Sequence, residues 1–111
     1  MSQLKDICID CADPMALAQW WAPVLEYRVF PHRDDVVGAD PIDGVGPRVW
    51  FNRVPEPKTV KNRMHIDIYG DVDDLLERGA THVASLPRWT VLADPEGNEF
   101  CVFAQTGRAS V

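Results

Sequence analysis

A histidine and an aspartate two residues apart form the first group in this sequence that could do chemistry. His65 and Asp67 lie in the alternating segment 63–69 (RMHIDIY), and residues two apart in a strand share a face. A carboxylate near an imidazole orients the ring for proton transfer or for metal binding. The pair therefore predicts either an acid–base site or a hydrogen-bonded histidine in a polar cavity. Tyr69 belongs to the same face.

Two cysteines could join His65 as ligands of a metal ion. Cys8 and Cys101, with His65, would form a soft ligand set for Zn²⁺, and Asp10 or Glu99 could supply a fourth ligand. A small buried thiol that faces a cavity is the more common reason for a free cysteine. We therefore expect no cofactor. The alternative is a divalent metal held by Cys8, His65, Glu99 and Cys101.

The tryptophans suggest a binding role. Trp50 lies in an alternating segment near residues 48–54, and a rigid indole offers a large contact area to a planar ligand at a small entropic cost. Trp89 is expected either at the mouth of a cavity or at a subunit contact. Lys58, Lys61 and Arg63 form a local cationic cluster, which is typical of a solvated connector, although it could also attract a carboxylate or phosphate.

The elements that must position these residues have the same predicted order in each half of the chain: a strand, a helix and three strands. Alternation in residues 6–11 places Cys8 and Asp10 on one face and the apolar residues on the other. Residues 55–62 (PEPKTVKN) are polar and contain proline, which does not continue a central strand. They are predicted to link the two halves.

Capping residues mark the start of both predicted helices. Asp13 and Asp71 can each accept hydrogen bonds from the free backbone donors of a first turn. Leu17, Trp21 and Leu25 recur every four residues and predict the buried side of the first helix. Pro23 predicts a kink or an early end. In the second helix, Leu75 and Leu76 are expected to point inward.

Short repeated phrases indicate a duplication. The pair Ile-Asp precedes both helices, and Ala-Asp-Pro precedes both closing strands. Both matches are short, so they support a repeat without identifying the fold.

Three longer sequence segments resemble those of a known protein family. The helix phrase DPMALAQWWAPVL, the strand HIDI and the ending DPEGNEFCVF resemble glyoxalase-like domains of the vicinal oxygen chelate superfamily. The resemblance implies an α+β fold with two tandem βαβββ modules, at about 5–54 and 63–105, joined by the linker 55–62. It also implies an incomplete eight-stranded barrel with outer helices and an internal ligand cavity.

The resemblance also implies where a site would lie. In metal-using members, the first and last strands of each module supply the ligands, usually His and Glu. Superposing the halves by their repeat pairs Cys8 with His65 and Trp50 with Cys101, although a two-residue slip would put Asp6 in place of Cys8. Because only His65 is a usual ligand and tryptophan cannot bind a metal, we expect the standard metal centre to be lost.

The net charge and the cysteine content limit the classes of partner and the cellular location that we expect. The chain has 11 Lys and Arg against 17 Asp and Glu, a formal net charge of -6, which argues against phosphate-backbone binding to nucleic acids. Its uncharged stretches are far shorter than the ~20 residues of a membrane span. Three cysteines without a disulfide pattern are expected to be reduced thiols. A cytoplasmic protein is therefore expected, with no membrane partner.

These observations lead to two main hypotheses about function, beside a third in which the chain is a purely structural or regulatory dimer module. The first is a glyoxalase-like protein that binds a small apolar or aromatic molecule without catalysis, as drug-sequestering relatives do. The second is a lyase, isomerase or dioxygenase-type enzyme with a non-standard metal set or with His65 and Asp67 as acid and base. A homodimer is expected in either case, since open strand edges need to be covered.

Overall fold

A computed structural model describes residues 1–104, which fall into two compact units that divide between Pro57 and Lys58. Each unit contains a strand, a helix and three strands in that order. The α+β class and the two βαβββ modules predicted from the sequence are therefore confirmed. The division lies inside the predicted linker 55–62, whereas residue 105, the predicted end of the second module, lies outside the described residues.

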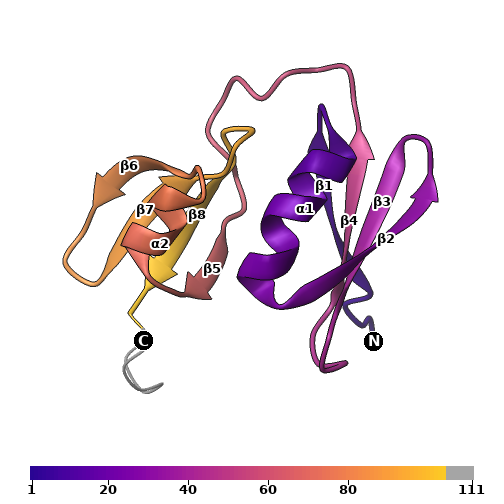
Figure 1. The fold of residues 1–111 in the computed structure, drawn as a ribbon, viewed down its shortest axis with the longest axis horizontal. Coiled ribbons are helices and arrows are strands. Elements are labelled where there is room, and N and C mark those ends of the chain that lie inside the picture. The colour runs from indigo at the N-terminus through magenta and orange to yellow at the C-terminus, as the bar shows by residue number, and fades with distance from the viewer. Residues whose placement is uncertain (105–111) are drawn as a thin grey trace. The chain divides into compact units, whose positions relative to one another are not determined.

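The first module has a four-stranded mixed sheet in the order β1-β4-β3-β2 (Figure 1). Strand β1 runs parallel to β4, and the other neighbours are antiparallel. Its elements are β1 (Asp6–Cys11), α1 (Pro14–Leu25), β2 (Tyr27–Arg33), β3 (Val36–Pro41) and β4 (Arg48–Arg53). The parallel pair requires a crossover, which α1 and the β2–β3 hairpin supply.

Helix α1 begins and ends as its sequence indicates. The Asp13 side chain accepts a hydrogen bond from the Ala16 N–H at 3.1 Å, which satisfies one free donor of the first turn. Pro23 lies inside the helix, which continues for two further residues and ends at Leu25. Glu26 then turns the chain with a left-handed φ of 60°. The helix thus stops one residue before β2 begins.

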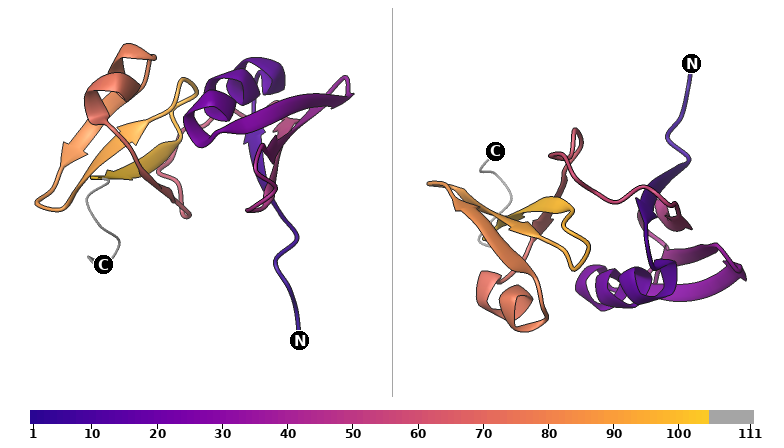
Figure 2. Two further views of the ribbon diagram at one scale, coloured as in Figure 1. Left: turned by 60° about the horizontal axis from the view of Figure 1, so that its bottom comes forward. Right: turned by 90° about the horizontal axis from the view of Figure 1, so that it is seen from above.

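The core of the first module lies between α1 and one face of its sheet (Figure 2). Leu17 and Trp21 from the helix are buried, as predicted, whereas Leu25 at the helix end is only half-buried. Val49 and Phe51 from β4 are buried as well. Each fully buried side chain of this size contributes about 1.5–3 kcal/mol relative to an exposed one. Because strand residues alternate, Trp50, which stands between Val49 and Phe51 in β4, lies on the face opposite α1.

The second module repeats this topology with the sheet order β5-β8-β7-β6 and a parallel β5–β8 pair. Its elements are β5 (Ile66–Tyr69), α2 (Val72–Glu77), β6 (Thr81–Ser85), β7 (Trp89–Ala93) and β8 (Glu99–Phe103). Asp71 caps α2 by accepting from the backbone N–H groups of Asp73 and Asp74. Figure 2 shows α2 along one face of this sheet.

Two expectations for the second module are wrong in part. The strand predicted over residues 63–69 begins only at Ile66, where its ladder with β8 starts with the pair Ile66–Phe100. Leu75 is buried at 3% exposure, but Leu76 is 37% exposed. A helix of six residues presents little more than one turn to the sheet, so it buries only one of two adjacent leucines.

Among the helices within residues 1–104, none has the length and apolar character that a membrane span needs.

Candidate functional site

The face of the first sheet opposite α1 carries a row of side chains that crosses all four strands. The register pairs Cys8 with Trp50, Trp50 with Gly38, and Gly38 with Phe30. Directly paired residues lie on the same face of a sheet. Trp50 and Phe30 can therefore meet only across the intervening Gly38.

Three aromatic rings meet at this row. The Phe30 and Trp50 ring centroids are 5.5 Å apart at an interplanar angle of 75°, and the His32 and Trp50 centroids are 5.0 Å apart at 55°. A Cβ atom built on Gly38 would lie only 2.2 Å from Phe30 Cζ. The Phe30 ring thus occupies the space that any larger residue at position 38 would need.

Arg48 adds a fixed positive charge to the aromatic rings. Its Nε donates to Asp40 Oδ1 at 2.6 Å and its Nη2 to Asp40 Oδ2 at 3.0 Å. Its Cζ lies 4.8 Å from the Phe30 centroid and 5.2 Å from the Trp50 centroid, within cation–π range. The hydrogen bonds to Asp40 raise the pKa of Arg48 further. Its Nη1 group makes no hydrogen bond in the described residues.

Asp6 holds the indole in place. Trp50 Nε1 donates to Asp6 Oδ2 at 2.8 Å, and Lys5 Nζ donates to the same oxygen at 2.7 Å. The hydrogen bonds from Lys5 and Trp50 lower the pKa of Asp6, so this acceptor stays ionised at neutral pH. Cys8 and Asp10 are exposed on the same face of β1.

The sequence identified Trp50, Cys8 and Asp10 on this face but not the residues that surround Trp50. Phe30 and Gly38 were missed because they lie on β2 and β3, where no motif marked a function. The alternation of side chains along residues 27–33 and 36–41 would have placed Phe30 and Gly38 on the Trp50 face, once the strand order and register were known. From here on, Phe30, Trp50 and Arg48 are called the aromatic–arginine platform.

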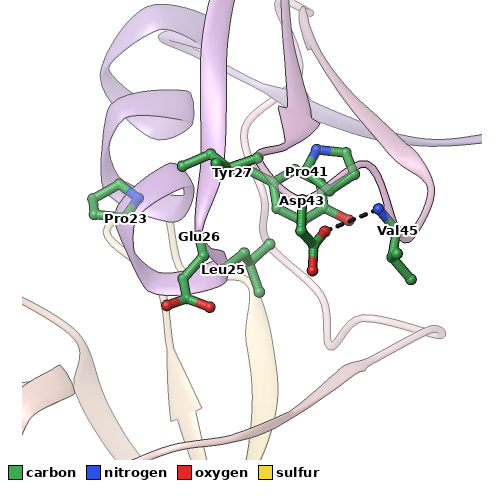
Figure 3. A pocket seen from close by; sticks show the side chains of 8 residues that line it. Pro23, Leu25, Glu26, Tyr27, Pro41, Asp43 and Val45 are labelled. Carbon is green, nitrogen blue, oxygen red and sulfur yellow. Dashed lines mark hydrogen bonds between the residues drawn. The ribbon is translucent and has the colours of Figure 1, made fainter.

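The first module also has a pocket that the sequence did not predict (Figure 3). It has a volume of about 430 Å³ and lies between the end of α1, the start of β2 and the loop after β3. Tyr27 contributes its ring, and its hydroxyl donates to the Pro47 carbonyl at 2.8 Å. The lining residues are Pro23, Leu25, Glu26, Tyr27, Pro41, Ile42, Asp43 and Val45.

In the second module, the face opposite α2 carries Asp67, Tyr69 and Cys101. The register pairs Asp67 with Cys101 and Tyr69 with Phe103, so these residues share a face, as the alternation predicted. Cys101 is 7% exposed. Burial, and then the charge and hydrogen bond of Asp67, raise the pKa of the Cys101 thiol. Cys101 is therefore a protonated thiol at neutral pH.

Trp89 belongs to the same face. Its ring stacks on that of Phe103 with centroids 5.8 Å apart and an interplanar angle of 26°. Strand β8 thus links Trp89 on one side to Tyr69 on the other.

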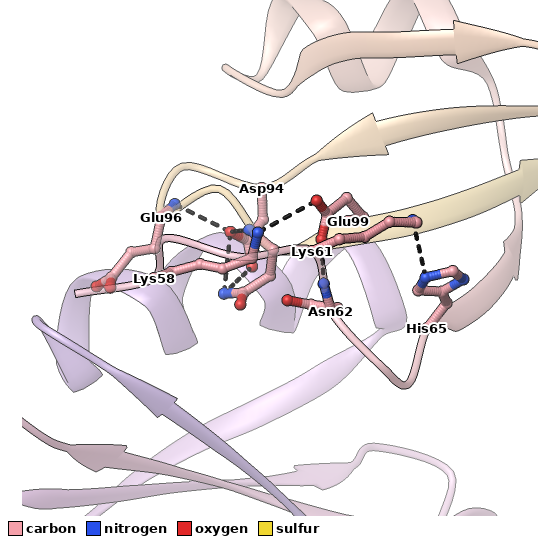
Figure 4. Close-up of polar contacts among 8 residues, drawn as sticks. Lys58, Lys61, Asn62, His65, Asp94, Glu96 and Glu99 are labelled. Atoms are coloured by element: carbon pink, nitrogen blue, oxygen red, sulfur yellow. Dashed lines mark hydrogen bonds and ion pairs between the residues drawn. The ribbon is translucent and has the colours of Figure 1, made fainter. Parts of the chain in front are cut away.

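His65 precedes β5 in the connecting segment and is exposed (Figure 4). Its Nε2 lies 3.2 Å from Lys61 Nζ. No hydrogen bond joins His65 and Asp67 in the part of the chain that the structure describes. Asp67 contacts the Cys101 thiol instead. The structure therefore does not assemble an imidazole–carboxylate pair within this module.

Glu99 anchors the segment that leads into β5. Its Oε1 accepts from the Asn62 backbone N–H at 3.0 Å, and its Oε2 accepts from Lys58 Nζ at 3.1 Å (Figure 4). Burial opposes ionisation of Glu99, but these hydrogen bonds outweigh it and lower its pKa. Both carboxylate oxygens are thus engaged within the protein.

The phrase DPEGN forms the turn between β7 and β8. The Asp94 carboxylate is 2% exposed and accepts from the backbone N–H groups of Glu96 and Asn98, each at 2.9 Å. Gly97 N–H donates to the Asp94 carbonyl at 2.8 Å, with a φ of 89° at Gly97. The phrase that most resembled a family motif therefore has a structural role here.

The strand registers show that the two predicted matches between the halves, Cys8 with His65 and Trp50 with Cys101, cannot both hold. Trp50 pairs with Cys8 in the first module, and Cys101 pairs with Asp67 in the second. If Trp50 and Cys101 are equivalent, Cys8 corresponds to Asp67, and His65 corresponds to Asp6. The registers thus favour the two-residue slip over the pairing of Cys8 with His65.

The donors present do not fit a metal centre within either module. Cys101 is buried against Asp67, Glu99 is paired with Lys58, and His65 lies in the connecting segment beside Lys61. No group of three or more His, Cys, Asp or Glu side chains within residues 1–104 is arranged to hold a metal ion.

Comparison with known proteins places these observations in a family. A family model described as a glyoxalase-like domain matches residues 6–103. Two solved structures have a TM-score of 0.71: a glyoxalase/bleomycin resistance protein/dioxygenase family enzyme from Burkholderia phytofirmans PsJN, 19% identical, and the fosfomycin resistance protein FosX from Listeria monocytogenes, 16% identical. The first alignment covers 95% of this chain and 100% of that one, and the second covers 96% and 93%.

A third structure, described as a possible glyoxalase from Bacillus cereus, has a TM-score of 0.68 at 13% identity, covering 94% of this chain and 100% of that one. At such identities these likenesses show the fold alone. No curated protein matches the sequence.

Proposed function

The chain belongs to the glyoxalase-like domain family, and from that premise we propose that it binds an aromatic or apolar small molecule without a resident metal ion. The aromatic–arginine platform is the proposed contact surface. The proposal concerns the first module, in which the platform is complete.

The observation that supports this most directly is that the platform is held in place by ion pairs and hydrogen bonds before any ligand arrives. Asp40 fixes Arg48 through two hydrogen bonds, and Asp6 fixes the Trp50 indole through one. Binding to groups that are already ordered loses less side-chain entropy than binding to mobile groups. Phe30 and Trp50 are only half-buried, so their rings keep surface for a ligand.

The chemistry of the platform favours a planar ligand. Aromatic rings attract one another in stacked or edge-to-face geometry, with about 0.5–1.5 kcal/mol beyond the burial of their area. Arg48 Nη1 is free to donate to an acceptor on the ligand. Asp40 largely neutralises Arg48, so a neutral aromatic molecule with one hydrogen-bond acceptor suits the platform best.

The absence of a resident metal is part of this proposal. It is supported by the donors themselves: Trp50 cannot bind a metal, the thiol of Cys101 is protonated, and Glu99 already accepts two hydrogen bonds. Elemental analysis of the purified protein should find well below one Mn, Fe, Ni or Zn per chain. One equivalent of any of these metals would refute this part of the proposal.

The alternative, an enzyme of the lyase, isomerase or dioxygenase type, receives no specific support from the site. His65 contacts Lys61, and Asp67 contacts Cys101. Acid–base catalysis by this pair would require the two side chains to act on one substrate atom, and no contact in the described residues brings them together.

The binding proposal can be tested with 2-naphthol, a neutral planar probe. We expect it to shift the indole N–H resonance of Trp50 in ¹⁵N-edited spectra, assigned through Trp50→Phe, and to bind at least several-fold more weakly to that variant. Trp89→Phe is the matched control, because Trp89 lies in the other module, and it should leave binding unchanged. Equal loss in both variants, or no shift at Trp50, would exclude the platform as the site.

A homodimer and a cytoplasmic location complete the proposal. No disulfide joins the three cysteines within the described residues, which is consistent with a reducing compartment. Mass measurement by light scattering should give twice the mass of the chain, and a monomer at micromolar concentration would contradict the dimer.

A further inference from the structure

The pocket at the end of α1 has two carboxylates and no basic residue in its lining (Figure 3). They belong to Glu26 and Asp43. The Asp43 Oδ1 atom accepts from the Val45 N–H at 2.9 Å, and neither carboxylate makes an ion pair in the described residues. By contrast, Asp40 and Glu99 each form an ion pair with a basic side chain.

The end of the helix adds to this negative charge. The last carbonyl groups of an α-helix carry partial negative charge, which basic residues usually offset. Helix α1 has twelve residues and no basic residue in its last turn, and Glu26 stands at its C-cap. A positive charge inside the pocket would therefore interact favourably with the helix end as well as with both carboxylates.

The remaining lining is apolar and aromatic. Leu25, Pro23 and Pro41 contribute hydrocarbon surface, and Tyr27 contributes a ring whose hydroxyl is tied to the Pro47 carbonyl. The face of a tyrosine ring attracts cations within about 6 Å of its centroid. Burial, and then the charge of Asp43, raise the pKa of Tyr27, so the phenol stays neutral.

We propose that this pocket binds a small organic cation, an ammonium group carried on a compact apolar body. The volume of about 430 Å³ exceeds what a bare metal ion needs, and the two carboxylates alone would leave most of the coordination positions of such an ion to water. An anion would meet two carboxylates and a helix C-terminus. A neutral apolar molecule would gain no electrostatic attraction from the two carboxylates of the pocket.

The test compares 3,3-dimethylbutylammonium with its neutral analogue, 3,3-dimethylbutan-1-ol. Neither probe is aromatic, which separates this pocket from the aromatic–arginine platform. The backbone N–H resonances of Gly44 and Val45, in the loop that borders the pocket, serve as reporters. We expect the cation to shift them in a saturable manner and the alcohol to bind at least threefold more weakly.

Charge removal should weaken binding of the cation at the pocket alone. Glu26→Gln and Asp43→Asn should each weaken it by about two- to fivefold, the range of an exposed ion pair. Asn can still accept the Val45 hydrogen bond, so Asp43→Asn keeps the turn. Glu26→Gly removes the same charge while favouring the left-handed φ at this position, so it should fold at least as stably and bind as weakly as Glu26→Gln.

Glu77→Gln, an exposed change in the second module, is the matched control and should bind like the unaltered protein. Equal binding of the alcohol and the ammonium, or equal weakening by Glu77→Gln, would overturn the proposal. Saturable displacement of the ammonium by CaCl₂ at constant ionic strength would likewise overturn it, in favour of a metal ion.

Discussion

Replacement of Gly38 by alanine tests whether the Phe30 ring depends on the absence of a side chain beneath it. The new Cβ would lie 2.2 Å from Phe30 Cζ and 2.6 Å from Cε1. Nonbonded carbon atoms prefer separations of about 3.5–4.0 Å, so the ring must retreat by roughly 1.3–1.8 Å. The φ of Gly38 lies outside the left-handed region, and its backbone therefore accepts alanine.

The cost to stability follows from what the ring loses. Its edge-to-face contact with Trp50 accounts for about 0.5–1.5 kcal/mol, and its contact with Arg48 for about 0.5–1 kcal/mol. Replacing glycine by alanine at a compatible site returns about 0.4–1 kcal/mol by restricting the unfolded chain. Gly38→Ala should therefore destabilise the protein by about 0–2 kcal/mol and weaken 2-naphthol binding by about two- to tenfold.

A double-mutant cycle with Phe30→Ala separates the clash from other effects. Once the ring is removed, Gly38→Ala should stabilise the protein by about 0.4–1 kcal/mol. Urea unfolding measures the free energy of unfolding of all four proteins, and calorimetry measures the binding of 2-naphthol. The reasoning is refuted if Gly38→Ala costs the same with and without Phe30, or if it leaves naphthol binding unchanged.

Three further outcomes follow from the second module and the cysteines. Because the folded pKa of Glu99 is lowered, its stabilising contribution is complete above the unfolded pKa and is lost as the pH falls through the folded value; Glu99→Gln should flatten this part of a stability–pH profile. Asp94→Ala should cost about 2–4 kcal/mol in urea unfolding, since it leaves buried turn donors unpaired, and Asp94→Asn should cost less. Iodoacetamide should alkylate exposed Cys8 well before Cys101, which is buried and has a raised pKa; mass spectrometry that finds Cys101 modified first would contradict the described environment.

The fold was predictable because its evidence is local. Asp13 and Asp71 cap their helices as expected, and the alternation in residues 6–11 gave the correct faces for β1. The errors occur where a neighbouring strand decides the result. Residues 63–65 alternate like a strand, but the ladder with β8 begins only at the pair Ile66–Phe100.

The candidate site was predictable only residue by residue. Trp50 could be selected from its type and its strand position, but the sequence does not show which side chains contact its ring. Asp6, Phe30 and Arg48 reach it from β1, β2 and from two positions earlier in β4.

The order of polar and apolar residues, with a few aspartates, prolines and glycines, is enough to determine the order of the strands and helices of this protein and which way their side chains alternate. These choices depend on backbone geometry within a few residues. The partners of a side chain depend instead on strand order and register, which arise only when the sheet assembles. The hydrogen bond from Trp50 to Asp6, the Phe30 ring over Gly38 and the pocket beside Glu26 were therefore decided by the tertiary structure.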